Sequence, residues 1–210
     1  MKNLRLMLLA LIGVIAANSL SSCNDDDDNK IENNVRTLTE AEKTQYKQVV
    51  NGDYTGYVIY QHPDSVRPDS FPVNWKVDMI SSTMTVENFP YQLLKGVAQP
   101  EKEVLEAAGN QTLRAEVTPF VADYEQYINE GVCRYQVIPS NKKMIFKAND
   151  KDITIDFATS ISNGYYRYDA IGVYYNGEFS CNIIFDQLTV GYTIYAVNQM
   201  AVMIGKKVTY

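Results

Sequence analysis

The stretch IGVYYNGEFSCNIIF, residues 171 to 185, decides the fold class because it holds the strongest turn signal in the chain. Both central residues of a type I′ turn need positive φ, and Asn176 followed by Gly177 tolerates that best. A two-residue loop also fixes the register, so it sets Tyr174 opposite Phe179. The sequence therefore predicts an antiparallel hairpin here.

This register sorts the side chains of the hairpin onto two faces. The first face is predicted to be core and carries Tyr168, Ala170, Tyr174, Phe179, Cys181, Ile183 and Phe185. The second is too apolar to be simply solvated, since it carries Ile171, Val173, Tyr175 and Ile184. A helix, a second sheet, a partner or a ligand must cover it, and we favour the helical segment near residues 90–108.

Other segments extend the β-rich pattern. Thr39–Glu42, TEAE, predicts a capped helix that runs to about Val50. Residues 61–72 contain three prolines and predict a loop. Pro100 and Gly109 frame a helix within an insertion at 90–108, and from Thr112 onward strands alternate with short connections, including a hairpin around NDKD. The expected fold is mainly β (α+β): an antiparallel β-barrel or sandwich with an N-terminal helix and this helical insertion, in one domain at 36–210.

The first 22 residues predict a secretory signal peptide. Lys2 and Arg5 precede an apolar run from Leu6 to Ala17. These twelve residues are fewer than the roughly 20 that a membrane-spanning helix needs. We therefore expect a leader that is removed.

Leu20, Ser21, Ser22 and Cys23 resemble the bacterial lipobox, whose cysteine becomes the acylated first residue of the mature protein. This resemblance implies lipidation at Cys23 and attachment to a membrane through the lipid, against the alternative of a soluble secreted protein. Residues 23–35 would then be an acidic tether. Four adjacent carboxylates repel one another and stay solvated; they are Asp25, Asp26, Asp27 and Asp28.

An acidic run directly after the lipidated cysteine is similar to the export signal of Bacteroidetes-type lipoproteins. It implies the outer face of the outer membrane, with a periplasm-facing lipoprotein as the alternative. The net charge of −6 and a pI near 4.9 argue against nucleic acid as a partner.

No pattern of residues in the sequence points to catalysis. His62 is the only histidine, so a triad that needs histidine or a two-histidine metal site cannot be built. The carboxylate pairs Asp64 with Asp69 and Asp150 with Asp152 lie in polar, turn-like sequence, where we expect them to be solvated. We therefore expect no enzyme activity, no bound metal and no cofactor.

With Cys23 assigned to lipid, Cys133 and Cys181 remain. Both lie in alternating segments among large apolar residues, so both should point into the core. In an oxidising compartment they could form a disulfide. Two buried free thiols are the alternative, and the spacing does not decide between them.

The densest aromatic cluster is a candidate ligand face; it comprises Tyr165, Tyr166, Tyr168, Tyr174 and Tyr175. Exposed tyrosines on a rigid sheet can stack on sugar rings, whereas core packing is the ordinary alternative. Together with the lipobox and the acidic run, the β-rich chain resembles Bacteroidetes-type surface lipoproteins of unknown-function domains, and its opening resembles that of lipocalin-like barrels. We expect a non-catalytic cell-surface lipoprotein that binds a small molecule, a glycan or a protein, or else a structural or adhesive envelope component.

Overall fold

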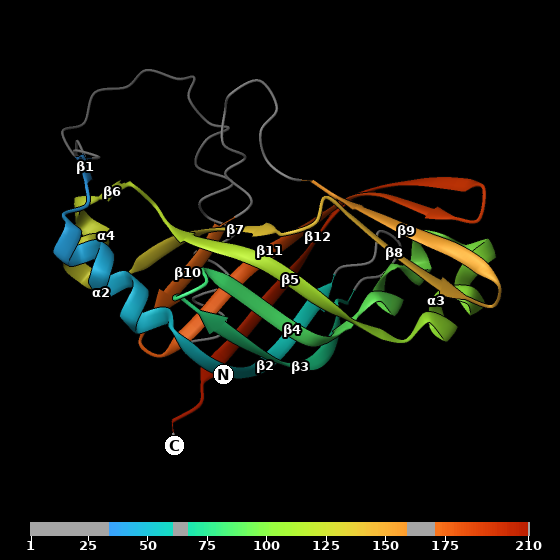
Figure 1. The fold of residues 1–210 in the computed structure, drawn as a ribbon, viewed down its shortest axis with the longest axis horizontal. Coiled ribbons are helices and arrows are strands. Elements are labelled where there is room, and N and C mark those ends of the chain that lie inside the picture. Colours follow the sequence, from blue (N-terminus) through green and yellow to red (C-terminus); the bar gives the residue numbers. More distant parts are fainter. Residues whose placement is uncertain (1–33, 61–66, 159–170, 210) are drawn as a thin grey trace. The chain divides into compact units, whose positions relative to one another are not determined.

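The computed structural model describes residues 34–60, 67–158 and 171–209 (Figure 1). They belong to the second of two compact units, Asn34–Tyr210. Cys23, the aspartate run at 25–28 and the tyrosines at 165, 166 and 168 lie outside the described residues. In the described segments, no helix is both long and apolar enough to cross a membrane.

Strands dominate the described residues. They are β1 (Val35–Thr37), β2 (Gly52–Tyr60), β3 (Asp69–Asp78), β4 (Thr83–Pro90), β5 (Asn110–Pro119), β6 (Ala122–Tyr124), β7 (Cys133–Pro139), β8 (Lys143–Ala148), β9 (Lys151–Phe157), β10 (Ile171–Tyr175), β11 (Glu178–Val190) and β12 (Thr193–Lys207). The helices are α2 (Glu40–Val50), the 3₁₀ turns η1 (Tyr91–Gly96) and η2 (Gln99–Glu101), α3 (Lys102–Ala108) and α4 (Glu125–Glu130).

Eight of these strands close into an antiparallel barrel. Around the ring their order is β10, β7, β5, β4, β3, β2, β12 and β11, and β11 pairs back with β10 to complete it. The barrel confirms the predicted mainly β fold and decides between barrel and sandwich. A separate two-stranded sheet joins β1 to β6.

The β10–β11 hairpin forms in the predicted register. Tyr174 lies opposite Phe179, and Asn176 and Gly177 have φ values of 49° and 80°. Large side chains fill the interior between the strands, with Tyr54, Tyr135, Phe89, Phe179 and Phe185 among the most buried. The barrel interior is therefore a packed core.

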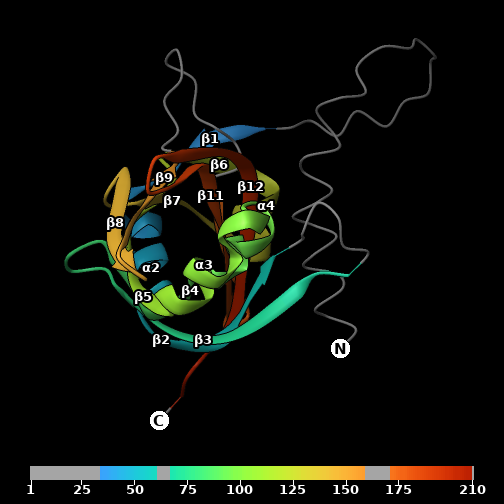
Figure 2. The same cartoon turned by 90° about the vertical axis from the view of Figure 1, so that its right-hand side faces the viewer.

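One end of the ring is closed by α2 (Figures 1 and 2). The predicted capping box starts this helix: the amide of Glu42 donates to the hydroxyl of Thr39, and the amide of Thr39 donates to the Glu42 carboxylate. At the other end of the helix, the barrel supplies donors to its last carbonyls. The Tyr54 hydroxyl donates to the Val50 carbonyl at 2.6 Å, and the Lys207 ammonium donates to the Val49 carbonyl at 2.9 Å.

The opposite end is closed by η1 and α3, which pack on each other and against β5 and β8. Leu93, Leu94 and Leu105 are buried there. The expectation that this segment covers the second face of the β10–β11 hairpin is therefore wrong, because these leucines fill the end of the barrel instead. Ile171 and Ile184 on that face are nevertheless buried, which agrees with the prediction that it is not solvated.

Two different strands share one edge of β11. Residues up to Cys181 pair with β10, whereas Phe185 to Val190 pair with β9, and the register shifts between Phe185 and Gln187. At the end of the barrel that carries α3, the β9–β8 hairpin therefore takes the place of β10 beside β11. The wall there consists of β8, β9, β11 and β12, and β8 is its edge.

Candidate functional site

A cleft of about 330 Å³ opens where β5 and β8 diverge. A backbone hydrogen bond from the Ser140 amide to the Arg114 carbonyl, at 2.9 Å, joins β5 to the segment between β7 and β8. Beyond it, β7 no longer pairs with β5, and among the described strands β8 pairs with β9 alone. The cleft is lined by Thr112, Leu113, Arg114, Asn141, Met144 and Phe157.

The floor of the cleft is apolar and well supported. Leu113 and Phe157 are buried, and Met144 is half-buried. Behind them, ring contacts join Phe157 to Phe185 at 5.6 Å, Phe185 to Phe89 at 6.2 Å and Phe89 to Tyr91 at 4.9 Å. Such packing leaves the floor little freedom to collapse into the cleft.

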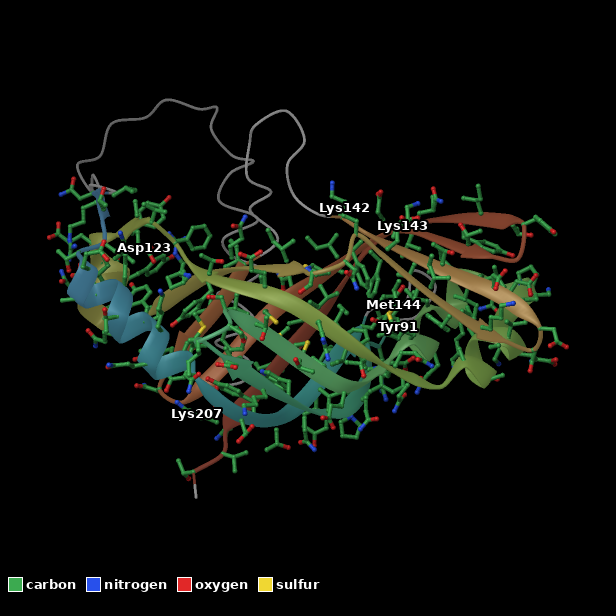
Figure 3. The ribbon with its side chains drawn as sticks, viewed as in Figure 1. Tyr91, Asp123, Lys142, Lys143, Met144 and Lys207 are labelled. Atoms are coloured by element: carbon green, nitrogen blue, oxygen red, sulfur yellow. The ribbon has the colours of Figure 1, made fainter. Side chains whose placement is uncertain are left out.

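Tyr91 is one of the rings behind the floor, and its ring also contacts the ring of Phe146 in β8, with the centroids 5.8 Å apart. Its hydroxyl is buried without a hydrogen-bond partner among the described residues. Burial raises the pKa of Tyr91 above its usual value, so the hydroxyl stays neutral. Figure 3 labels Tyr91 beside Met144 of β8, with Lys142 and Lys143 labelled farther away toward the start of that strand.

Basic side chains lie next to the lining residues along β8. Lys143 pairs with Asp156 at 3.0 Å, and Lys147 pairs with Asp152 at 3.4 Å. Arg114 and Lys142, by contrast, make no side-chain ion pair or hydrogen bond with any residue that the structure describes. Arg114 therefore lines the cleft, and its guanidinium has no partner among the described side chains.

Arg114 and the Asn141 amide offer hydrogen-bond donors beside apolar side chains, but the six lining residues include no acid, thiol or histidine. Within the described part of the chain, no group of three or more histidine, cysteine, aspartate or glutamate side chains could hold a metal ion.

Two of the predicted ligand-face tyrosines fall in β10, away from this cleft. Tyr174 packs against the core beside Phe179, whereas Tyr175 is 39% exposed. In the described segments these two therefore point to opposite faces of their strand. Tyr165, Tyr166 and Tyr168 lie outside the described residues.

Cys133 and Cys181 are both buried free thiols. They lie in β7 and β11 on either side of β10, where Cys133 pairs with Tyr174 and Cys181 pairs with Gly172. Burial raises the pKa of Cys133 to about 11 and that of Cys181 to about 12. Both thiols therefore behave as small apolar core residues.

A comparison with protein families matches residues 49–190 to the domain of unknown function DUF4840. The chain belongs to this family. The DUF4840 match begins at the end of α2 and stops at the last residue of β11, so it includes every lining residue of the cleft and excludes β12. The comparison with curated proteins found no match.

Sequence reasoning missed the cleft residues. Arg114 and Thr112 look like ordinary outward positions of an alternating strand, and Met144 looks like the start of the MIFKA hairpin strand. Their proximity depends on where β5 stops pairing with β7, which the local pattern does not encode.

Proposed function

We propose that this DUF4840 protein is a non-catalytic binding protein, held at the outer membrane by lipid on Cys23, whose ligand site is the cleft between β5 and β8. One observation carries the proposal: Arg114, which has no ionic partner among the described residues, lines a cleft with a rigid apolar floor at the place where the barrel wall opens. Ligand sites commonly combine apolar lining with a few convergent polar groups.

The location rests on the sequence. The short leader, the small residues before Cys23 and the acidic run after it support export and lipid attachment. Acyl chains gain about 0.8 kcal/mol per buried methylene, so more than one chain gives stable anchoring. A negative net charge also makes nucleic acid an unfavourable ligand.

The absence of acid, base or nucleophile pairs in the lining supports a binding role. The Thr112 hydroxyl has the Glu87 carbonyl as a hydrogen-bond acceptor at 3.4 Å and no base beside it in the lining. Activation of that hydroxyl would need a neighbouring general base.

Saturation-transfer NMR of the full chain in detergent micelles, with a library of small organic acids and glycans, tests the site. Met144→Trp should fill the cleft and abolish the signals of the ligands. Ile145→Trp is the matched control, because it lies next to Met144 in β8 but is 69% exposed on the other face. Ligands that bind Met144→Trp as well as the native chain would show that the cleft is not the site.

A structural or adhesive role is the second candidate, and the outer face of the wall at the α3 end favours it. Ile145, Thr154, Thr189 and Ile194 lie in register across β8, β9, β11 and β12. Both isoleucines are largely exposed, and Tyr192 at the β11–β12 turn is fully exposed. A photo-crosslinker at Ile194 should capture an envelope partner, whereas one at Lys76 of β3 should not; equal labelling would contradict this role.

A further inference from the structure

Building on the proposed binding role of the cleft, we propose that its ligand is the carboxyl-terminal end of an extended peptide. The terminal carboxylate would meet Arg114 and Asn141, and the last side chain would rest on Leu113, Met144 and Phe157. The peptide backbone would lie along the free edges of β5 and β8. Three features of the cleft support this ligand class.

The first feature is the free edge of β5. Successive residues of a strand direct their backbone groups to opposite edges, and the Arg114 carbonyl faces the β7 edge because it accepts from Ser140. The N–H and C=O of Thr112 therefore point to the same edge, past the end of the β7 pairing. They are available to an extended peptide, as in strand addition.

The second feature is the matching edge of β8. The Lys142 carbonyl accepts from the Phe157 amide, so even-numbered residues of this strand face β9. The backbone groups of Lys143 and Ile145 consequently point away from β9, toward the open edge. Lysines at an exposed edge discourage pairing with another copy of the same strand, because equal charges would oppose each other. Lys142, whose side chain pairs with no described residue, offers the complementary charge to a peptide that ends in a carboxylate.

The third feature is the combination of charge and apolar floor. An arginine can bind a carboxylate through two parallel hydrogen bonds, and the Asn141 amide can add another. The described arginines Arg36 and Arg134 already pair with Glu42 and Asp123, whereas Arg114 pairs with no described residue. The adjacent floor of Leu113, Met144 and Phe157 favours an apolar last residue.

The cleft volume sets the length of the bound segment. About 330 Å³ lies at the lower end of the roughly 300–1,000 Å³ of ligand pockets. It holds the last one or two residues of a peptide, and the residues before them would run out along the strand edges.

Fluorescence anisotropy with the full chain in detergent micelles tests the ligand class. The probe is a dye-labelled hexapeptide of glycine and serine that ends in leucine, as the free acid and as the C-terminal amide. The free acid should bind about 10- to 100-fold more tightly, which is the range expected for hydrogen bonds to a charged group. Arg114→Ala should remove this difference, and Arg114→Lys should retain part of it.

Lys76→Ala, on the exposed side of β3, is the matched control and should leave binding unchanged. Circular dichroism and the melting temperature establish that each variant is folded. Equal binding of the acid and the amide, or a preference that survives Arg114→Ala, would overturn the inference.

N-acetyl-leucine, tested by saturation-transfer NMR, separates the two proposals. If it binds in a manner that Met144→Trp abolishes while the peptide acid shows no preference over its amide, the peptide assignment is wrong and the binding cleft stands. If neither ligand binds the native chain, the peptide assignment is wrong, and the test of the binding cleft is the library of organic acids and glycans with Met144→Trp.

Discussion

The hydroxyl of Tyr135, a fully buried residue of β7, donates a 2.7 Å hydrogen bond to the backbone carbonyl of Tyr46 in α2. The two rings also lie 6.0 Å apart. Strand β7 of the barrel is thus bonded to α2, the helix that closes one end of the barrel. The two bonded residues lie about 90 positions apart in the chain. Together with Tyr54 and Lys207, Tyr135 ties the carbonyls of α2 to the barrel.

Tyr135→Phe should therefore destabilise the domain while leaving the packing intact. We expect a loss of about 0.5–1.5 kcal/mol in the free energy of unfolding, which is the net contribution of a typical hydrogen bond. Urea unfolding measures it. Tyr192→Phe, at a fully exposed hydroxyl, is the control and should cost nothing measurable. An equal effect of both substitutions would show that the Tyr135 bond does not hold the helix.

The N-terminus of the same helix predicts a pH dependence. The Arg36 guanidinium, followed by the Thr39 amide, lowers the pKa of Glu42 to about 2 from its ordinary 4.5. A lowered pKa in the folded state stabilises the fold above the ordinary value, and this contribution is lost as the pH falls from 4.5 toward about 2. Glu42→Gln should make the urea concentration at the unfolding midpoint depend less steeply on pH across this range. If the urea midpoint of Glu42→Gln changed with pH as steeply as that of the native chain, the assignment would be contradicted.

The Asp123–Arg134 pair predicts a larger effect on stability. Asp123 is fully buried in β6, and its carboxylate pairs with Arg134 of β7. The rings of Phe120, Tyr124 and Tyr127 lie 5.0–5.2 Å from the guanidinium carbon of Arg134.

Asp123→Ala should cost about 3–5 kcal/mol, because it leaves a largely buried cation without its partner. Figure 3 labels Asp123 near α2, far from the cleft, so peptide binding should be unaffected in the fraction that remains folded. Thermal unfolding is the measurement, and the double variant Asp123→Ala, Arg134→Leu should recover part of the loss. A double variant no more stable than Asp123→Ala would argue against an unpaired charge as the cause.

The thiols offer a test of both burial and lipidation. Because burial raises the pKa of Cys133 and Cys181 to about 11 and about 12, neither should react with iodoacetamide at about pH 8 in the folded chain. After unfolding in guanidinium chloride, mass spectrometry should find both labelled. Cys23 should stay unlabelled in chain purified from membranes if it carries lipid, and labelling at Cys23 would refute the anchor.

Local signals made much of the fold predictable. Asn176 and Gly177 specified a turn type and therefore a register, and the Thr39 capping box specified where a helix begins; both predictions are confirmed. The loop predicted at 61–72 is shorter than expected, because β3 already begins at Asp69. Pro72 fits that strand since β4 pairs with β3 only from Trp75 onward.

The candidate site was not predictable for a physical reason. Arg114 can line a cleft because the pairing of β7 with β5 ends beside it, and because β8 pairs with β9 and not with β5. Both events depend on strand pairings between distant segments. Likewise, Asp123 and Arg134 sit in unremarkable sequence, and only the fold brings β6 and β7 together with three rings.

The position of β12 has a consequence for how the barrel assembles. This strand lies between β2 and β11, so it joins Gly56 to Gly205 across nearly the whole described chain. Contacts so distant in sequence slow folding, because a long loop must close before they form. Until β12 arrives, β2 and β11 each present an unprotected edge to other molecules. The folding chain therefore passes through an incomplete sheet with unpaired edges that can associate with other molecules. The pairing of β12 closes the ring and removes these edges.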